Sequence, residues 1–115
     1  MTSVVIIDDD QETIDNLSTY LKMHGVETLG TALDGSFGLE LYEKHNPDFI
    51  ITDYNMPKRD GLFVIDSVKK VYPKSKIIVL SGFASAEVKL QSFASEGVTV
   101  LEKPVDNDEL LSLLK

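Results

Sequence analysis

Short, almost wholly apolar runs constrain the fold of this chain more than any other feature of its sequence. Each run is rich in valine and isoleucine and is bounded by polar or turn-forming residues. The runs cover residues 4–7, 49–51, 77–80 and 98–101. Continuous apolarity over so few residues is typical of strands buried on both faces, as in a parallel sheet that helices cover on each side. A fifth segment, residues 26–30, alternates more and suits the edge of such a sheet.

Between these runs, apolar residues recur at the three- and four-residue intervals of amphipathic helices. The stripes are formed by Ile14, Leu17 and Leu21, by Phe37 and Leu41, by Leu62, Ile65 and Val68, by Val88, Phe93 and Ala94, and by Leu110, Leu111 and Leu114. Gly25, Asn46 and Gly97 are suited to helix ends, and Asp60 and Asp106 to helix starts. The order strand–helix, five times over, predicts an α/β fold: a doubly wound five-stranded parallel sheet with right-handed crossovers.

Length and composition narrow the classes of protein to which the chain can belong. Its 115 residues suffice for one domain with one core. No apolar run approaches the roughly 18 residues of a membrane helix, and the start MTSVVIIDDD lacks the basic region of a signal peptide, so we expect no membrane association. The absence of cysteine makes the reducing cytoplasm the expected compartment. A net charge of −8 argues against direct nucleic-acid binding.

Polar residues whose side chains can bind a ligand or take part in a reaction directly follow the predicted strands. They are Asp8, Asp9 and Asp10 after the first strand, Asp53 and Asn55 after the third, Ser81 after the fourth and Lys103 after the fifth. In an open parallel sheet, ligands bind beyond the carboxyl ends of the strands, so these side chains are expected to meet at one edge. Two carboxylates about 4 Å apart repel each other by about 4 kcal/mol near a protein surface, which favours a cation among them.

The all-oxygen donor set favours Mg²⁺, for which Mn²⁺ can substitute. A simpler interpretation of the first acid cluster is also open: Asp9 or Asp10 can serve only to cap the following helix. The presence of acids after two strands, together with a lysine after another, favours a site over a cap alone.

These segments resemble the receiver domains of response regulators in two-component signalling. The segments are VVIIDDD, FIITDYNMPKRDG, IIVLSG and VLEKP, and they occur in the order and spacing of that family from Val4 to Leu114. The resemblance implies the flavodoxin-like strand order 2-1-3-4-5. It also implies that residues 1–115 form a single receiver domain, whose last helix is short enough to be a truncated one.

The resemblance assigns the metal ligands and the acceptor. Asp53 is implied to accept the phosphoryl group and to contact the metal. Asp9 is implied to bind Mg²⁺ directly, Asp8 through water, and Asn55 through its backbone carbonyl. Such a domain is not an enzyme in the usual sense, since it phosphorylates and dephosphorylates only itself.

The remaining roles concern the phosphoryl oxygens and the partners. Ser81 and Lys103 are implied to neutralise phosphoryl oxygens, with a cis bond between Lys103 and Pro104 that aims the lysine back at Asp53. The implied donor is a sensor histidine kinase or a histidine phosphotransfer protein. The face formed by the fourth helix, the fifth strand and the fifth helix is implied to contact an output domain or a second copy.

The chain departs from the family pattern in two places, and other classes of protein stay open. Val100 stands where many receivers carry a switching aromatic residue, and Phe83 lies near the expected mouth of the site, either guarding it or packing as core. A pseudo-receiver that only binds proteins is one alternative. A haloacid-dehalogenase-like phosphatase with Asp8 as nucleophile is another, although Glu12 breaks that family's pattern. A flavin or dinucleotide binder is disfavoured because no glycine-rich loop follows the first strand.

Overall fold

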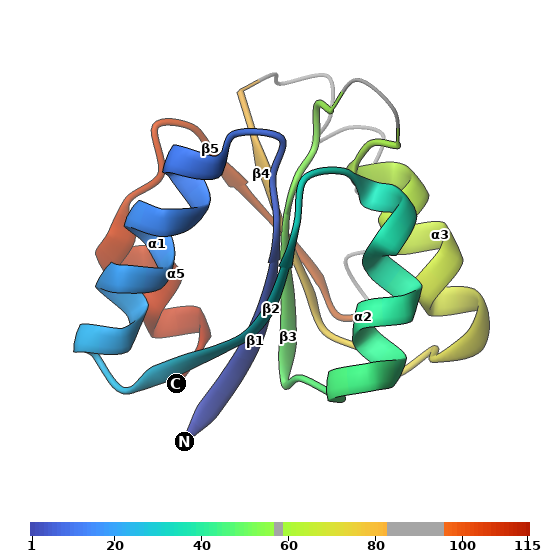
Figure 1. The fold of residues 1–115 in the computed structure, drawn as a ribbon, viewed down its shortest axis with the longest axis horizontal. Coiled ribbons are helices and arrows are strands. Elements are labelled where there is room, and N and C mark those ends of the chain that lie inside the picture. The colour runs from blue at the N-terminus through green and yellow to red at the C-terminus, as the bar shows by residue number, and fades with distance from the viewer. Residues whose placement is uncertain (57–58, 83–95) are drawn as a thin grey trace.

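Five parallel strands form one sheet in the order 2-1-3-4-5, which confirms the predicted fold (Figure 1). The computed structural model describes residues 1–56, 59–82 and 96–115. The strands are β1 (Thr2–Ile7), β2 (Val26–Ala32), β3 (Phe49–Asp53), β4 (Ile77–Ser81) and β5 (Val98–Glu102). The helices are α1 (Gln11–Met23), α2 (Gly38–His45), α3 (Gly61–Val71) and α5 (Asn107–Leu113), with a 3-10 turn, η1 (Gly35–Phe37), before α2. The helix predicted around Val88 and Phe93 lies outside the described residues.

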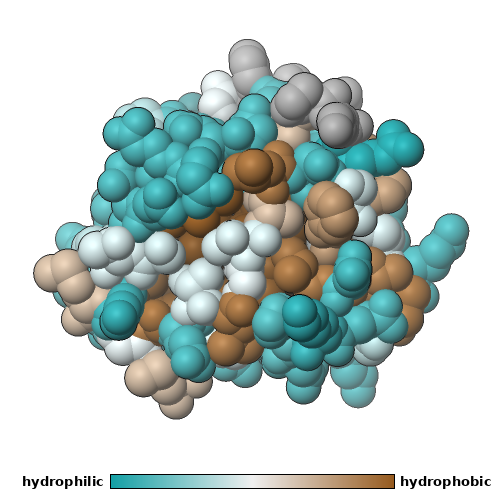
Figure 2. All heavy atoms as spheres, in the orientation of Figure 1, coloured by the Kyte–Doolittle hydropathy of each residue, from teal (hydrophilic) through white to brown (hydrophobic). Residues whose placement is uncertain are grey.

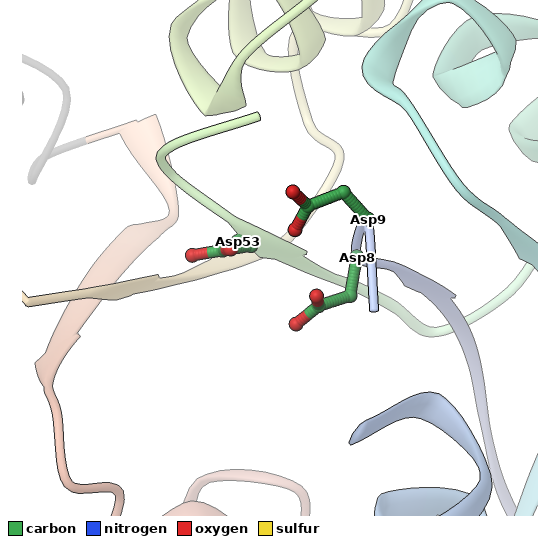
Figure 3. A group of neighbouring side chains, drawn as sticks. All are labelled: Asp8, Asp9 and Asp53. Carbon is green, nitrogen blue, oxygen red and sulfur yellow. The ribbon is translucent and has the colours of Figure 1, made fainter. Parts of the chain in front are cut away.

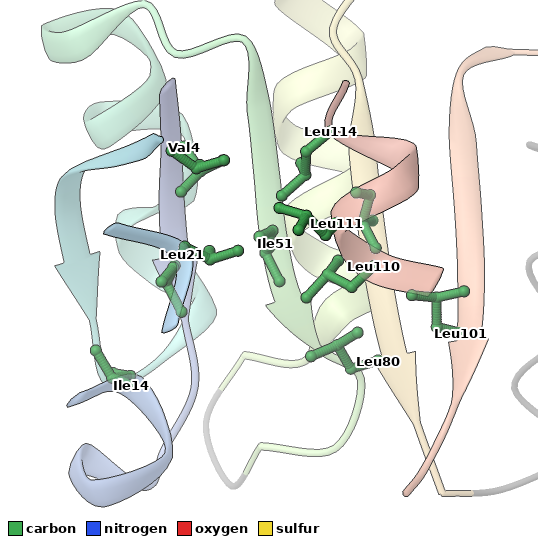
Figure 4. Close-up of a cluster of buried hydrophobic side chains, with 12 residues drawn as sticks. Val4, Ile14, Leu21, Ile51, Leu80, Leu101, Leu110, Leu111 and Leu114 are labelled. Atoms are coloured by element: carbon green, nitrogen blue, oxygen red, sulfur yellow. The ribbon is translucent and has the colours of Figure 1, made fainter. Parts of the chain in front are cut away.

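Helices cover both faces of the sheet, with α1 and α5 on one face and α2 and α3 on the other (Figure 1). Alternate residues of β1 therefore enter different cores: Val4 and Ile6 pack in the α1/α5 layer, whereas Val5 and Ile7 pack in the α2/α3 layer. Figure 4 shows the first of these cores, in which Leu110 of α5 contributes a fully buried side chain. This double burial is the physical reason why the strands read as continuous apolar runs.

The strands extend past their apolar runs into the polar residues that follow. Asp53 ends β3 and pairs in register with Leu80 of β4, and Ser81 ends β4 and pairs with Glu102 of β5. The ladder continues because backbone hydrogen bonding does not depend on the polarity of the side chain. As a result, Asp53 and Ser81 stand on the last rungs of the sheet and not in loops.

Short polar side chains fix the helix boundaries. Asp60 and Asp106 cap α3 and α5 as predicted, by accepting from the backbone N–H groups of Phe63 and Asp108 at 3.0 and 2.9 Å. Asn46 ends α2 in the left-handed conformation, with φ of 46°. Each of these contacts satisfies a backbone group that the helix end leaves without an intrahelical partner.

Phe37 does not join Leu41 in a buried helical stripe, contrary to the sequence prediction. Asp34 accepts from the backbone N–H of Ser36 at 2.8 Å and starts η1, so α2 begins only at Gly38. Phe37 is the N-cap residue of α2 and remains 49% exposed. A position ahead of the first helical turn does not follow the helical period. The four-residue spacing of Phe37 and Leu41 therefore gave a wrong prediction.

Lys69 ties α3 to the segment that enters β5. Its side chain is 8% exposed, and its ammonium donates to the carbonyls of Pro73 at 3.2 Å, of Ser75 and of Glu96. Burial lowers the pKa of this ammonium, whereas the Glu96 carboxylate raises it. A charged group inside the protein is tolerated here because its hydrogen-bonding capacity is used on backbone oxygens.

We expect Lys69→Met to lower the free energy of unfolding by roughly 1–3 kcal/mol, because it removes the donor to the Ser75 carbonyl in a buried contact and to the Pro73 and Glu96 carbonyls in partly buried ones. The matched control is Lys70→Met, which removes an exposed lysine from the next position and should change stability by less than about 0.5 kcal/mol. Urea unfolding followed by circular dichroism measures both. Equal stability of the two variants would show that the Lys69 contacts contribute nothing.

Candidate functional site

Three aspartates converge at the carboxyl edge of the sheet (Figure 3). Asp8 and Asp9 follow the last residue of β1, and Asp53 is the last residue of β3, the neighbouring strand. One carboxylate oxygen from each lies within 4.8 Å of the others. Asp8 and Asp53 are buried, at 4% and 6% exposed, whereas Asp9 faces solvent. The adjacency of β1 and β3 therefore produces the cluster that the sequence predicted at this edge.

Asp10, the third acid of the DDD run, has a different task. It caps α1 by accepting from the backbone N–H of Glu12 at 3.1 Å and from the hydroxyl of Thr13 at 2.8 Å. Asp8 in turn accepts from the backbone N–H of Asp10 at 3.0 Å. The two interpretations of the run thus apply to different residues, because Asp8 and Asp9 belong to the cluster and Asp10 is the cap.

Lys103 reaches across the strand ends to Asp53. Its ammonium lies 2.9 Å from Oδ1 of Asp53, and the lysine side chain is 38% exposed against 8% for the aspartate. The bond between Lys103 and Pro104 is cis, as predicted. The backbone N–H of Lys103 donates to the carbonyl of Ser81 at 2.7 Å, so the lysine is held to the end of β4. A cation is therefore positioned next to the one aspartate that ends a central strand.

Two further predicted residues stand beside this pair. Ser81 is 2% exposed and lies one position beyond Leu80, the register partner of Asp53. Asn55 is exposed in the loop after β3, where Tyr54 N–H donates to the Leu80 carbonyl at 2.9 Å and anchors the start of that loop. Asn55 thus lies two residues after Asp53 in this loop.

The environment of the acid cluster raises the pKa of Asp8. Burial raises the pKa of Asp8 from 3.8 to about 6, and the neighbouring carboxylates of Asp53 and Asp9 add to the rise. The hydrogen bond from the Asp10 backbone and the Lys103 ammonium oppose it. A hard divalent cation fits this donor set, since the candidate ligands are all oxygens and its charge offsets both the cost of burying a carboxylate and the repulsion between the carboxylates.

Two neighbouring loops are fastened to the site by contacts that no motif in the sequence indicated. The backbone N–H of Asp8 donates to the carbonyl of Ala32 at the end of β2, at 3.0 Å. Gly35 N–H donates to the carbonyl of Arg59 at 2.9 Å and so joins the loop after β2 to the loop after Asp53. Phe83, on which a further expectation rested, lies outside the described residues.

Two features place the chain in the CheY-like class of signalling domain. One is the doubly wound parallel sheet with an acid cluster at its carboxyl edge. The other is the lysine that is paired to the aspartate at the end of the third strand. The sequence comparison gives the family. A sequence model of the response regulator receiver domain matches residues 4–115, and the chain belongs to that family.

Relatives and solved structures agree with this family assignment. The cell cycle transcriptional regulator CtrA of Caulobacter vibrioides is 28% identical over 95% of this chain and 47% of its own length. A response regulator receiver domain protein of Clostridium thermocellum superposes with a TM-score of 0.87 at 28% identity, covering 99% of this chain and 91% of that one. The CheX–CheY–BeF3–Mg²⁺ complex of Borrelia burgdorferi contains a chain with a TM-score of 0.85 at 26% identity, covering 96% and 84%. The chain spans about half the length of the curated relatives it matches.

None of the helices in the described ranges has the length and apolar character that crossing a bilayer requires.

We expect the stability of the metal-free protein to fall as the pH rises through the pKa of Asp8. The folded Asp8 carboxyl keeps its proton up to about pH 6, whereas the unfolded carboxyl loses it near 3.8, so the folded state loses stability across that interval. A shift of this size corresponds to about 3 kcal/mol. Asp8→Asn removes the effect, so the stability advantage of the variant over the parent should grow between pH 4 and pH 7.

Urea unfolding in EDTA at a series of pH values measures this difference. Asp66→Asn, which neutralises an exposed acid on α3, should shift stability equally at every pH. A constant advantage of Asp8→Asn across the range would contradict the raised pKa.

Proposed function

We propose that Asp53 accepts a phosphoryl group from a phosphohistidine on a sensor histidine kinase or a histidine phosphotransfer protein. The observation that carries the proposal is the position of the Asp53 carboxylate, which is buried, clustered with Asp8 and Asp9, and paired with Lys103 at 2.9 Å. A nucleophile for phosphoryl transfer needs nearby positive charge, because the three equatorial oxygens of the transferred group are anionic.

The transfer converts one bond to phosphorus into another. A carboxylate oxygen of Asp53 attacks the phosphorus, the bond from phosphorus to the histidine nitrogen breaks, and the imidazole takes a proton as it leaves. The product is an acyl phosphate, which water later hydrolyses back to the carboxylate and inorganic phosphate. The chain therefore turns over only its own phosphoryl group. Most of the catalysis is positioning and charge neutralisation.

The residues that would hold Mg²⁺ are Asp8, Asp9 and Asp53, with the backbone carbonyl of Asn55. The bound ion supplies positive charge to a phosphoryl oxygen and screens the acids from the incoming anion. The fit rests on the cluster of oxygens within 4.8 Å and on the raised pKa of Asp8, both of which a divalent cation relieves. The structure named for Borrelia burgdorferi CheY with BeF3 and Mg²⁺ supports the same assignment by analogy.

Lys103 and Ser81 complete the site. As the phosphoryl group arrives, the Lys103 ammonium moves from the Asp53 carboxylate to a phosphoryl oxygen, and the Ser81 hydroxyl donates to another. The cis bond that follows Lys103 and the backbone contact with Ser81 keep both groups at the same strand ends. Phosphorylation thus exchanges one set of contacts at β4 and β5 for another, which is how a signal can leave the site.

The partner that reads this change is proposed to bind the face of the fourth helix, β5 and α5, as an output domain or as a second copy. Part of that face lies outside the described residues. Support comes from the relatives, which are about twice as long as this chain and include a transcriptional regulator. The net charge of −8 favours a partner that performs any DNA binding, and we place the exchange in the cytoplasm with the kinase.

The alternatives fit the geometry less well. In a haloacid-dehalogenase-like mechanism Asp8 attacks and the acid two residues later acts on the leaving group, but Asp10 is engaged as the cap of α1. A pseudo-receiver needs no paired lysine and no complete acid cluster, and this chain has both.

Incubation with acetyl phosphate or phosphoramidate in excess Mg²⁺ should add one phosphoryl group to the protein, detected by intact mass. Asp53→Asn should abolish the addition, and EDTA should suppress it because the acids then repel the incoming anion. Asp66→Asn serves as the matched control and should be phosphorylated like the parent, since it lies on an exposed part of α3.

The same assay separates the mechanisms. Modification that persists in Asp53→Asn but disappears in Asp8→Asn would favour the phosphatase and overturn the proposal. A chain that stays unmodified under all conditions would instead support the pseudo-receiver.

Lys103→Met should separate metal binding from transfer. Loss of the ammonium that neutralises phosphoryl oxygens should slow phosphorylation by acetyl phosphate on the order of 10²-fold. The same loss makes the acid cluster more negative, so Mg²⁺ should bind about threefold more tightly or better. Calorimetric titration with Mg²⁺ and rates from intact mass measure the two effects, with Lys70→Met as the control. Parallel weakening of both would show that Lys103 supports the fold of the site and does not neutralise the transferred group.

A further inference from the structure

A concave surface lies beside the sheet edge, and its lining does not include the acceptor. Its volume is about 460 Å³, and it is built by the end of β2, the loop that follows, the start of α2 and the first residue of α1. In the orientation of Figure 1, Figure 2 shows apolar residues gathered in the band between the two helical layers, with hydrophilic surface on either side. We call the hollow lined by residues 11, 31–34, 37, 40, 41 and 44 the β2 groove. A pocket of such a volume is large enough to take bulky side chains of a partner.

Two large apolar side chains of the β2 groove face solvent. Leu33 directly follows β2 and is 51% exposed, and Phe37 is the last residue of η1 and is 49% exposed. Scattered single apolar residues on a surface need no explanation, but two that line the same hollow form a contiguous patch of the kind that marks interaction sites. Ala32 and Leu41, both partly buried, continue the apolar lining inward.

The exposure of Leu33 and Phe37 is imposed by the backbone and cannot be relieved by a small adjustment. Between them, Asp34 holds the N–H of Ser36 at 2.8 Å, and Gly35 donates to the carbonyl of Arg59 at 2.9 Å. A side chain at Gly35 would place its Cβ 2.4 Å from that same carbonyl oxygen, so the segment already lies as close to its neighbour as a backbone can. The two apolar side chains are therefore presented by a fixed loop, which lowers the entropic cost of binding.

The rim of the β2 groove is acidic. Asp34 and Glu40 line it. The described lining contains a single base, Lys44. This charge disfavours nucleic acid, an anionic bilayer and a second copy of a chain with net charge −8, since each would bring like charges together.

We propose that the β2 groove is a docking site for a peptide segment of a partner protein that carries bulky apolar side chains flanked by lysine or arginine. The apolar side chains cover Leu33 and Phe37, and the basic residues face Asp34 and Glu40. This surface is separate from Asp53 and Lys103 and from the face proposed for the output partner, so the inference goes beyond the phosphoryl transfer and does not depend on it.

The probe is a synthetic amphipathic helix of leucine and lysine, titrated into the isotope-labelled chain and followed by amide chemical shifts. The shifts should centre on residues 32–41, and raising the salt concentration should weaken binding. The double variant Leu33→Ser, Phe37→Ser should bind about tenfold more weakly or worse, because the apolar contact area is lost. Its matched control is Met23→Ser, Val71→Ser, which removes two exposed apolar side chains elsewhere, 77% and 51% exposed, and should bind like the parent.

The charge contribution has its own pair of variants. Glu40→Gln should weaken binding several-fold, whereas Glu109→Gln, on the exposed side of α5, should leave it unchanged. The same helix with glutamate in place of lysine should not bind. Thermal unfolding midpoints of all variants should match the parent, because each substitution is at a half-exposed or exposed position.

Three results would overturn the proposal. The first is equal binding of the leucine–lysine helix to the parent and to the Leu33→Ser, Phe37→Ser variant, which would mean that net charge alone attracts it. The second is a shift pattern centred on the acceptor edge, or loss of binding in Asp53→Asn, which would place the probe at the phosphoryl site. The third is self-association in sedimentation that the Leu33→Ser, Phe37→Ser variant abolishes, which would make a second copy the occupant.

Discussion

The crowding of three carboxylates at the end of two adjacent strands is the constraint on which the rest of this structure depends. Like charges within 4.8 Å of one another, two of them buried, are unfavourable in a folded protein unless something offsets them. Burial is the main cause of the raised pKa of Asp8, and the carboxylates of Asp53 and Asp9 add to it, even with Lys103 2.9 Å from Asp53. A site of this kind favours binding of a cation, which lowers the repulsion between the carboxylates and so allows an anion to approach.

The fold keeps the carboxylates together because every strand end near them is fastened. Asp8 is bonded through its backbone to Ala32 of β2, Tyr54 to Leu80 of β4, and Lys103 to Ser81 across to β5. The two apolar cores on either side of the sheet hold these strands rigidly, so the site residues have little freedom to move apart. Repulsion at the edge is therefore opposed by packing in the layers beneath, where apolar burial provides most of the stability of the fold.

Much of this could be predicted from the sequence, for identifiable reasons. Continuous apolar runs made four strands and their polar termini visible, and the alternating segment 26–30 indicated the edge strand. Family resemblance supplied the strand order and the cis bond after Lys103. Phe37 was misplaced because a 3-10 turn capped by Asp34 interrupts the helical period. The division of the DDD run into Asp8 and Asp9 at the cluster and Asp10 at the cap depends on local hydrogen bonds that spacing alone does not determine. The contact between Gly35 and Arg59 joins two loops, and the sequence of neither loop indicates it.

A crystal structure of this chain grown with Mg²⁺ and beryllofluoride tests the central claim most directly, because beryllofluoride mimics a phosphoryl group on a carboxylate. The account predicts beryllofluoride on the Asp53 carboxylate, the metal among the oxygens of Asp8, Asp9, Asp53 and the Asn55 carbonyl, and the Lys103 ammonium shifted from Asp53 to a fluorine atom. Beryllofluoride on Asp8, or an Asp53 carboxylate that still holds Lys103 with no adduct in the presence of both reagents, would contradict it.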